Sequence, residues 1–197
     1  MMKSLFPIFC LLVCPLMFVA CGSKTKTDDK QVYQISSIEY DSLKGQSVIV
    51  CADRMISAYN GRILSNSQRA GFYPGKAYRV ILYFGSGDCS ACALQQFYQW
   101  DGMMDHVGRD HVEYFYILRP DGNSELNLLV DALNQSYFSL PVLFDERGLF
   151  EQENVSLGLL GSSVGFLTDC DGKILVAGNP AADGGQFTRA VKRIVNQ

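Results

Sequence analysis

The sequence has little of what several functional classes require. It contains 17 Lys and Arg against 20 Asp and Glu, a formal net charge of −3 with its two His neutral. This balance argues against nucleic acid as a partner, because such binding depends on a basic surface that displaces counterions. The hydrophobic fraction of 48% excludes a disordered chain, which combines low hydrophobicity with high charge. We therefore expect one domain with a buried core.

Long hydrophobic runs are also missing, except for one at the start. Residues 5–20 (LFPIFCLLVCPLMFVA) carry no charge and follow Lys3. The run is shorter than the roughly 20 residues of a membrane-spanning helix, and it is typical of the apolar region of a secretory signal. We therefore interpret residues 1–20 as a signal peptide.

The signal ends in Phe18-Val-Ala-Cys21, which resembles the lipobox of bacterial lipoproteins, although Phe18 stands where Leu is usual. The resemblance implies that Cys21 receives lipid and becomes the mature N-terminus. The alternative is ordinary cleavage near Ala20, which leaves Cys21 as a free thiol. Gly22 follows the cysteine, and by the sorting rule of enteric lipoproteins this implies the outer membrane, facing the periplasm or the exterior.

A polar segment without apolar periodicity follows, over residues 21–34. Its composition predicts a flexible tether that holds the folded part near a lipid bilayer. The domain then spans residues 35–197. The lipid would be the only membrane anchor, because the basic side chains are scattered.

The seven cysteines differ in their expected fates. Two lie in the signal, and Cys21 is the lipidation candidate. Four remain in the domain: Cys51, Cys89, Cys92 and Cys170. An exported protein meets an oxidising compartment, so these four can form disulfides or be held reduced by a partner. Only the Cys89-Ser-Ala-Cys92 spacing has a meaning of its own.

The pair lies where a buried strand turns into a helix. Residues 78–84 (YRVILYF) are β-branched and aromatic, which predicts a strand. From Ser90 the apolar residues recur at spacings of three and four up to Gly108, which predicts a helix with one apolar face. Cys89 then stands at the helix N-terminus, where free N–H groups favour a thiolate, and Cys92 lies one turn further.

The remaining pattern predicts an α/β fold with a mixed sheet flanked by helices. A second strand is expected at residues 112–118, and a helix should carry the apolar residues 126–133. A short strand follows at 141–145, then a hairpin around 169–172 and a C-terminal helix over 187–195. Residues 48–50 and 63–64 suggest an additional edge strand or hairpin.

At this point the sequence resembles the thioredoxin superfamily, in particular its TlpA-like membrane-tethered thiol-disulfide proteins, from about residue 75 to the C-terminus. Three segments carry the resemblance: the strand-CSAC-helix unit, LPVLFDERG as an inserted short strand, and VGFLTDCDGKILVAGNP as the closing hairpin. It implies dithiol-disulfide exchange through Cys89 and Cys92, without a cofactor. The implied partners are protein thiols or disulfides and an electron donor that the sequence does not name.

Two positions depart from the family pattern. The cis-proline that precedes the hairpin in the family falls on Ser163 here, and we expect a trans bond before it. Pro141 is rejected as that proline, because the hairpin followed directly by the last helix marks the end of the fold. Asp88 stands where thioredoxins carry Trp. A carboxylate there disfavours the Cys89 thiolate, so we expect a pair no more oxidising than that of thioredoxin.

Other interpretations stay open. Cys89 and Cys92 could form a permanent disulfide in a binding or structural module that has lost exchange activity, and Ser163 favours this alternative. Glu113 is only a guess as the general base of the resolving cysteine.

A metal site is not expected. The CxxC motif supplies only two of the four ligands that a zinc ion needs. His106 and His111 are the candidate histidines, but His106 lies more than roughly three helical turns beyond Cys92. A Cys51–Cys170 disulfide has no support from spacing. Cys51 is better explained as a small core residue, and Cys170 as an incidental thiol in a turn.

Overall fold

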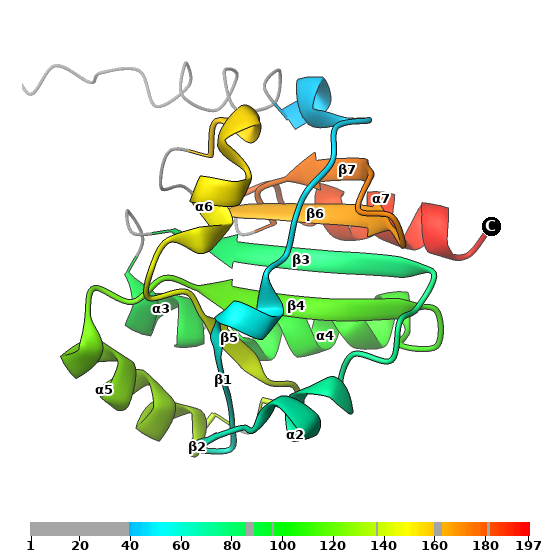
Figure 1. Cartoon of the computed structure of the whole chain (residues 1–197). Helices are drawn as coiled ribbons and strands as arrows, with labels where there is room; N and C mark the ends of the chain where they lie inside the picture. Colours follow the sequence, from blue (N-terminus) through cyan, green and yellow to red (C-terminus); the bar gives the residue numbers. More distant parts are fainter. Residues whose placement is uncertain (1–39, 86–88, 96, 137, 160–162, 181) are drawn as a thin grey trace, which may run out of the picture.

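The computed structural model describes residues 40–85, 89–95, 97–136, 138–159, 163–180 and 182–197 (Figure 1). Residues 1–39, which hold the expected signal peptide, Cys21 and the expected tether, lie outside the described residues, as does Asp88. Within the described part, no helix is long and apolar enough to cross a membrane.

Within the described residues, seven strands form one mixed sheet in the order β2-β1-β5-β4-β3-β6-β7. Their bounds are β1 Ile56–Tyr59, β2 Arg62–Ile63, β3 Tyr78–Phe84, β4 Val112–Leu118, β5 Val142–Phe144, β6 Val164–Asp169 and β7 Ile174–Gly178. β3, β4 and β5 run parallel, while β6, β7, β1 and β2 join antiparallel at the two sides. The expected mixed sheet, including the short inserted strand, is confirmed.

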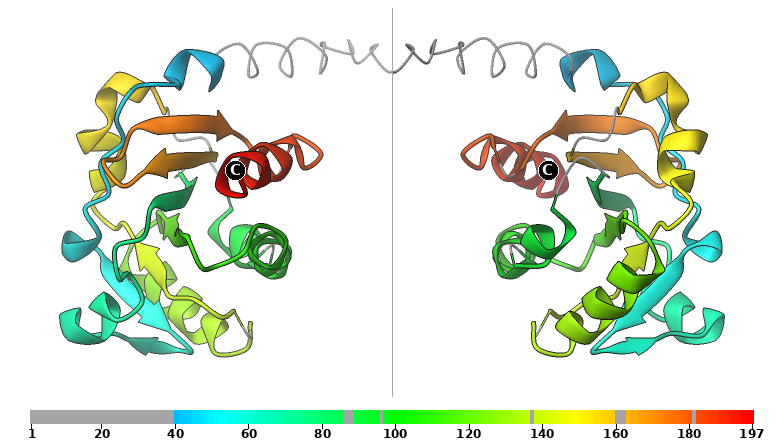
Figure 2. Two further views of the ribbon diagram at one scale, coloured as in Figure 1. Left: turned by 90° about the vertical axis from the view of Figure 1, so that its right-hand side faces the viewer. Right: turned by 90° about the vertical axis from the view of Figure 1, so that its left-hand side faces the viewer.

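Helices and turns cover both faces of the sheet (Figure 2). Their bounds are η1 Ala52–Arg54, α2 Asn66–Ala70, α3 Ser90–Gln95, α4 Phe97–Val107, α5 Asn123–Leu133, α6 Leu149–Glu153, η2 Val155–Leu157 and α7 Gln186–Val195. In Figure 2, α4 and α7 lie on one face, and α6 with the chain that precedes β1 lies on the other.

The alternation of side chains along β3 explains the two-sided core. Leu82 and Phe84 join the cluster that contains Trp100 of α4, whereas Ile81 and Tyr83 join the cluster that contains Phe150 of α6. All seven residues of β4 are buried, as expected of a central parallel strand with both faces covered. β3 and β4 have the bounds that the sequence predicts.

The helix expected from Ser90 to Gly108 corresponds to α3 and α4, which the structure describes on either side of Gln96; Gln96 itself is not described. The apolar stripe is buried at Ala93, Trp100 and Met104.

The strand expected at residues 48–50 is wrong. Ser47 makes an isolated antiparallel bridge to Lys173, and residues 48–50 then cross the sheet face without forming a strand (Figure 1). The Asn154 side chain accepts the Ile49 N–H and donates to the Ile49 carbonyl, both at 2.8 Å. These are the backbone groups that a strand partner would otherwise bind. The expectation at residues 63–64 is confirmed in part, because Ile63 belongs to β2 of the edge hairpin β1–β2.

The hairpin β6–β7 turns where the sequence predicts. Asp169 Oδ1 accepts from the backbone N–H groups of Asp171 at 3.0 Å and Lys173 at 2.9 Å. Gly172 has φ +83°, and a Cβ there would lie 2.7 Å from the Val48 carbonyl oxygen. The turn therefore needs glycine both for its backbone conformation and for the approach of the crossing segment.

Candidate active site at the end of the central strands

The two cysteines of the motif lie beyond the carboxyl end of β3. Cys89 immediately precedes α3, and its carbonyl accepts the N–H of Ala93 at 2.9 Å. Cys89 and Cys92 form a disulfide, with an S–S distance of 2.21 Å and Cα atoms 5.1 Å apart. Both residues are exposed. The structure thus presents an accessible disulfide at the start of a helix.

The first turn of α3 points a donor at the first sulfur. The backbone N–H of Cys92 donates to Cys89 Sγ at 3.2 Å. This N–H is one of those that a helix leaves without an internal acceptor. After reduction of the disulfide, the same donor can stabilise negative charge on Cys89.

Ser90 fastens the motif to the neighbouring strand. It is buried, and its hydroxyl donates to the Arg119 carbonyl at 3.3 Å. Arg119 directly follows β4, and its N–H donates to the Phe84 carbonyl at 3.0 Å. One backbone position therefore connects the end of β3 with the residue next to Cys89.

The Arg119 side chain belongs to a charged cluster that local sequence patterns do not reveal. Its Nη1 lies 2.6 Å from Glu151 Oε2, and the Tyr83 hydroxyl donates to Glu151 Oε1 at 2.8 Å. Burial first, and then the bond to Glu151, raise the pKa of Tyr83 far above its ordinary value. Partial burial lowers the pKa of Arg119, but Glu151 and Tyr83 outweigh it and the pKa is raised. Arg119 thus stays charged and Tyr83 neutral at physiological pH.

The inserted D-x-x-G segment explains how Glu151 reaches this place. Asp145, 1% exposed, accepts the N–H groups of Leu149 and Phe150, each at 2.8 Å, and so caps the start of α6. Gly148 has φ +64°, and a Cβ there would lie 2.9 Å from Arg119 Cζ. The glycine therefore lets the guanidinium approach the backbone before α6.

Ser163 lies at the same end of the sheet as the cysteines. It is half-buried and directly precedes β6, whose Val164 pairs with Tyr83 of β3. No cis peptide bond occurs among the described residues, so the bond before Pro141 is trans. The bond before Ser163 involves Ser162, which is not described, and the expected trans geometry there stays a prediction.

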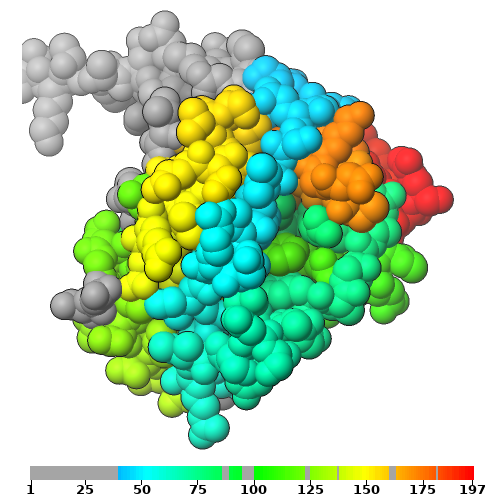
Figure 3. Space-filling view, viewed as in Figure 1, coloured from blue at the N-terminus to red at the C-terminus, as the bar shows by residue number. Residues whose placement is uncertain are grey.

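Glu113 does not lie near the cysteine pair. Its buried carboxylate pairs with Arg79 Nε at 3.6 Å and accepts the Gly75 N–H. In the parallel register, Arg79 faces Glu113 and Phe84 faces Leu118, five residues or roughly 16 Å further along. Glu113 therefore lines a hollow of about 350 Å³ at the opposite end of the sheet, on the face shown in Figure 3. The guess that it acts as the base is not supported.

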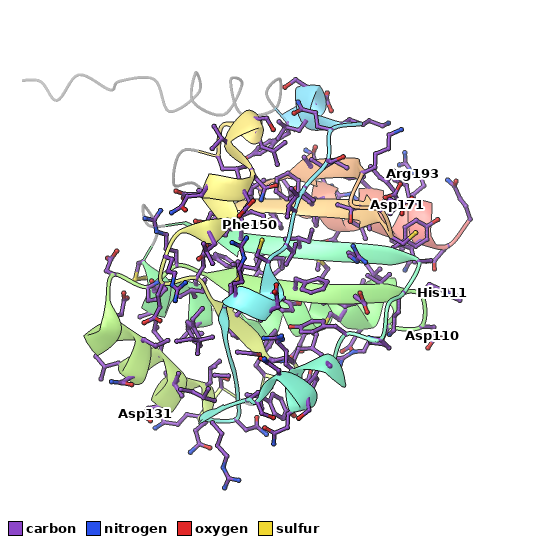
Figure 4. All side chains as sticks on the ribbon, viewed as in Figure 1. Asp110, His111, Asp131, Phe150, Asp171 and Arg193 are labelled. Atoms are coloured by element: carbon purple, nitrogen blue, oxygen red, sulfur yellow. A yellow bond between two sulfur atoms is a disulfide. The ribbon has the colours of Figure 1, made fainter. Side chains whose placement is uncertain are left out.

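The remaining candidate residues lie apart from the site. Cys51 and Cys170 are free thiols, so they form no disulfide with each other. Cys51 is buried, as predicted, and Cys170 is exposed in the β6–β7 turn. His106 is exposed on α4. Figure 4 shows His111 at the turn before β4, at the end of the sheet opposite to α3. Among the described residues, no three His, Cys, Asp or Glu gather as metal ligands.

Comparison with solved structures shows what fold this architecture represents. The C-terminal domain of a protein described as a thiol-disulfide oxidoreductase from Bacteroides thetaiotaomicron matches with a TM-score of 0.51 at 15% identity. The match covers 78% of this chain and 96% of that one. The thioredoxin domain of a thiol-disulfide oxidoreductase from Bacteroides vulgatus matches with a TM-score of 0.50 at 16% identity, over 78% and 98% of the two chains.

No family model matches the sequence, and no curated protein matches it either. At these identities, the structural likeness establishes the fold. The chain has the thioredoxin-like α/β fold that its sequence predicts.

Proposed function

We propose that this protein, which has the fold of the thioredoxin superfamily, is a thiol-disulfide oxidoreductase of the cell envelope. The observation that carries the proposal is the exposed Cys89–Cys92 disulfide at the start of α3. A bond at the surface can meet a second protein, and the N–H of Cys92 directed at Cys89 Sγ favours Cys89 as the attacking thiolate.

The reaction consists of two successive thiol-disulfide exchange steps and uses no cofactor. In the reduced protein, the Cys89 thiolate attacks a substrate disulfide, forms a mixed disulfide and expels one substrate thiolate, which takes up a proton. The Cys92 thiol then loses its proton and attacks Cys89 Sγ, which releases the second substrate thiolate. Two electrons pass to the substrate, and the Cys89–Cys92 disulfide forms. A dithiol partner restores the reduced pair by the reverse sequence.

The reduction potential tests this proposal. The full chain is equilibrated with a dithiothreitol series, quenched by thiol alkylation, and analysed by mass of the peptide that carries Cys89 and Cys92. We expect half-reduction near about −270 mV, the range of thioredoxin, because Asp88 opposes a more oxidising pair. A pair still oxidised well below about −300 mV is a structural disulfide and contradicts the proposal.

A second candidate is a binding or structural module with a permanent disulfide, and Ser163 at the position of the family's cis-proline favours it. Replacing Cys92→Ser separates the two functions. An exchanger leaves Cys89 trapped in mixed disulfides, which non-reducing electrophoresis of the cells displays. A scaffold forms none, and Cys89→Ser/Cys92→Ser is the matched control.

The envelope location rests on the N-terminal sequence. We propose that residues 1–20 are removed, that Cys21 carries lipid, and that residues 21–34 tether the domain to a bilayer, most simply the outer membrane. Replacing Cys21→Ser should then release the protein from the membrane fraction, and a variant that stays there contradicts lipid anchoring.

A further inference from the structure

We propose that Arg119 and Glu151 are positioning residues that set the environment of Cys89, so that the inserted helix α6 tunes the redox equilibrium of the pair. The inference rests on the proposed exchange function.

Main-chain contacts connect Arg119 to the Cys89-Ser-Ala-Cys92 motif. The Arg119 main chain bonds to Phe84 at the end of β3 and accepts the hydroxyl of Ser90. Ser90 is 5% exposed and follows Cys89 directly in the chain. The Arg119 backbone therefore helps to hold the first turn of α3. Ser90, which it binds, is the chain neighbour of the attacking Cys89.

Glu151 and Tyr83 together fix the orientation of the Arg119 guanidinium. Glu151 of α6 holds Arg119 Nη1 at 2.6 Å. Tyr83, fully buried in β3, holds the other carboxylate oxygen at 2.8 Å. Gly148 leaves room for this contact. The side chain is thus fixed by α6 and β3, and its positive charge is balanced by Glu151.

An unbalanced charge at Arg119 or Glu151 would change the dithiol-disulfide equilibrium of the cysteine pair. Reduction of the disulfide by glutathione follows one balanced equation, in which the disulfide and two glutathione molecules yield the dithiol and one glutathione disulfide. Only the reduced protein can carry negative charge on Cys89. A cation left unpaired at Arg119, whose carbonyl binds Ser90 next to Cys89, therefore favours the dithiol, and an anion left unpaired at Glu151 favours the disulfide.

The experiment measures this exchange constant for the full chain at pH 9, where a cysteine of ordinary pKa is mostly ionised. Glu151→Gln removes the anion and should shift the constant at least threefold toward the dithiol. Arg119→Gln should shift it at least threefold the other way. Threefold corresponds to about 14 mV, at 29.6 mV per tenfold change. The double variant should return to within twofold of the wild type.

A matched control lies on the same helix. Glu153 pairs with Arg54 in an exposed contact, and Glu153→Gln should leave the constant within twofold. Shifts of the same sign in both single variants, or shifts below twofold, overturn the inference, because a purely structural contact does not reverse sign. If Arg119→Gln does not fold, the near-isosteric Glu151→Gln decides alone. A wild-type pair that does not exchange with glutathione overturns the proposed function as well.

Discussion

At the scale of single residues, the four cysteines of the domain occupy three different environments. Cys89 and Cys92 are joined at the surface, Cys170 is exposed in a turn, and Cys51 is 8% exposed. Arg54 Nη2 also lies 2.7 Å from Cys51 Sγ, which covers the sulfur further. The two free thiols, Cys51 and Cys170, therefore differ in how accessible they are to solvent.

These environments predict a large difference in alkylation. In the native oxidised protein, Cys170 should react with iodoacetamide at least about 100-fold faster than Cys51, because a buried thiol reacts only after the structure opens. Peptide mass analysis over a time course measures both rates. In urea the two rates should converge, and comparable rates in the native protein would show that Cys51 is accessible.

At the scale of elements, the segment from β5 to η2 joins distant parts of the chain. Asp145 caps α6, Glu151 binds Arg119, and Asn154 binds Ile49 of the crossing segment 48–50. Asn154 is 2% exposed and makes three side-chain hydrogen bonds, two to Ile49 and one to the Phe150 carbonyl at 2.7 Å. The segment from β5 to η2 thereby connects the end of the sheet that carries Cys89 and Cys92 with the chain that precedes β1.

Removing the Asn154 amide should cost stability. In Asn154→Ala, the partly buried backbone groups of Ile49 and the buried carbonyl of Phe150 lose their side-chain partner. A buried group left without a partner costs about 1–3 kcal/mol. We expect the free energy of unfolding to fall by about 2–3 kcal/mol in urea denaturation at pH 7. The exposed neighbour provides the control: Ser156→Ala should change it by less than about 0.5 kcal/mol, and an equal effect of the two variants would contradict this account.

At the scale of the whole molecule, polar groups gather at both ends of a strongly apolar sheet. The cysteine pair, Ser163 and the Arg119–Glu151 pair lie at the carboxyl ends of β3 and β4, and Arg79 with Glu113 lies at the other end. Between them the central strands bury several tyrosines. Burial is the first cause that raises the pKa of Tyr83, Tyr114 and Tyr116 above the ordinary value of 10.

The buried tyrosines predict alkaline destabilisation. Their pKa is higher in the folded protein than in the unfolded chain. The neutral tyrosines therefore contribute fully to the free energy of unfolding below about pH 10, and this contribution is lost as the pH rises beyond it. Above pH 10, each such group should lower the free energy of unfolding by up to about 1.4 kcal/mol per pH unit. Urea denaturation at pH 8, 9.5 and 11 measures this. Tyr83→Phe should show a smaller loss, and equal stability at pH 8 and 11 would refute the prediction.

The sequence by itself determined the central strands, the hairpin and the place of Cys89 and Cys92 at a strand-to-helix turn. Local features encode these elements: an apolar run, a period of three and four, and a turn built on Asp169 and Gly172. It also marked the D-x-x-G segment, but not its role.

Only the tertiary structure decided which residues surround the motif. Tyr83 and Glu151 are 68 residues apart, and Ile49 and Asn154 are 105 apart, so no local pattern relates them. For the same reason no local pattern tests the guess that Glu113 is the general base, whereas the parallel register places Glu113 at the far end of its strand from the cysteines. In the unfolded chain these charged and amide groups bind water. They need each other as partners only once the sheet order buries them side by side, because a buried polar group without a hydrogen bond is costly.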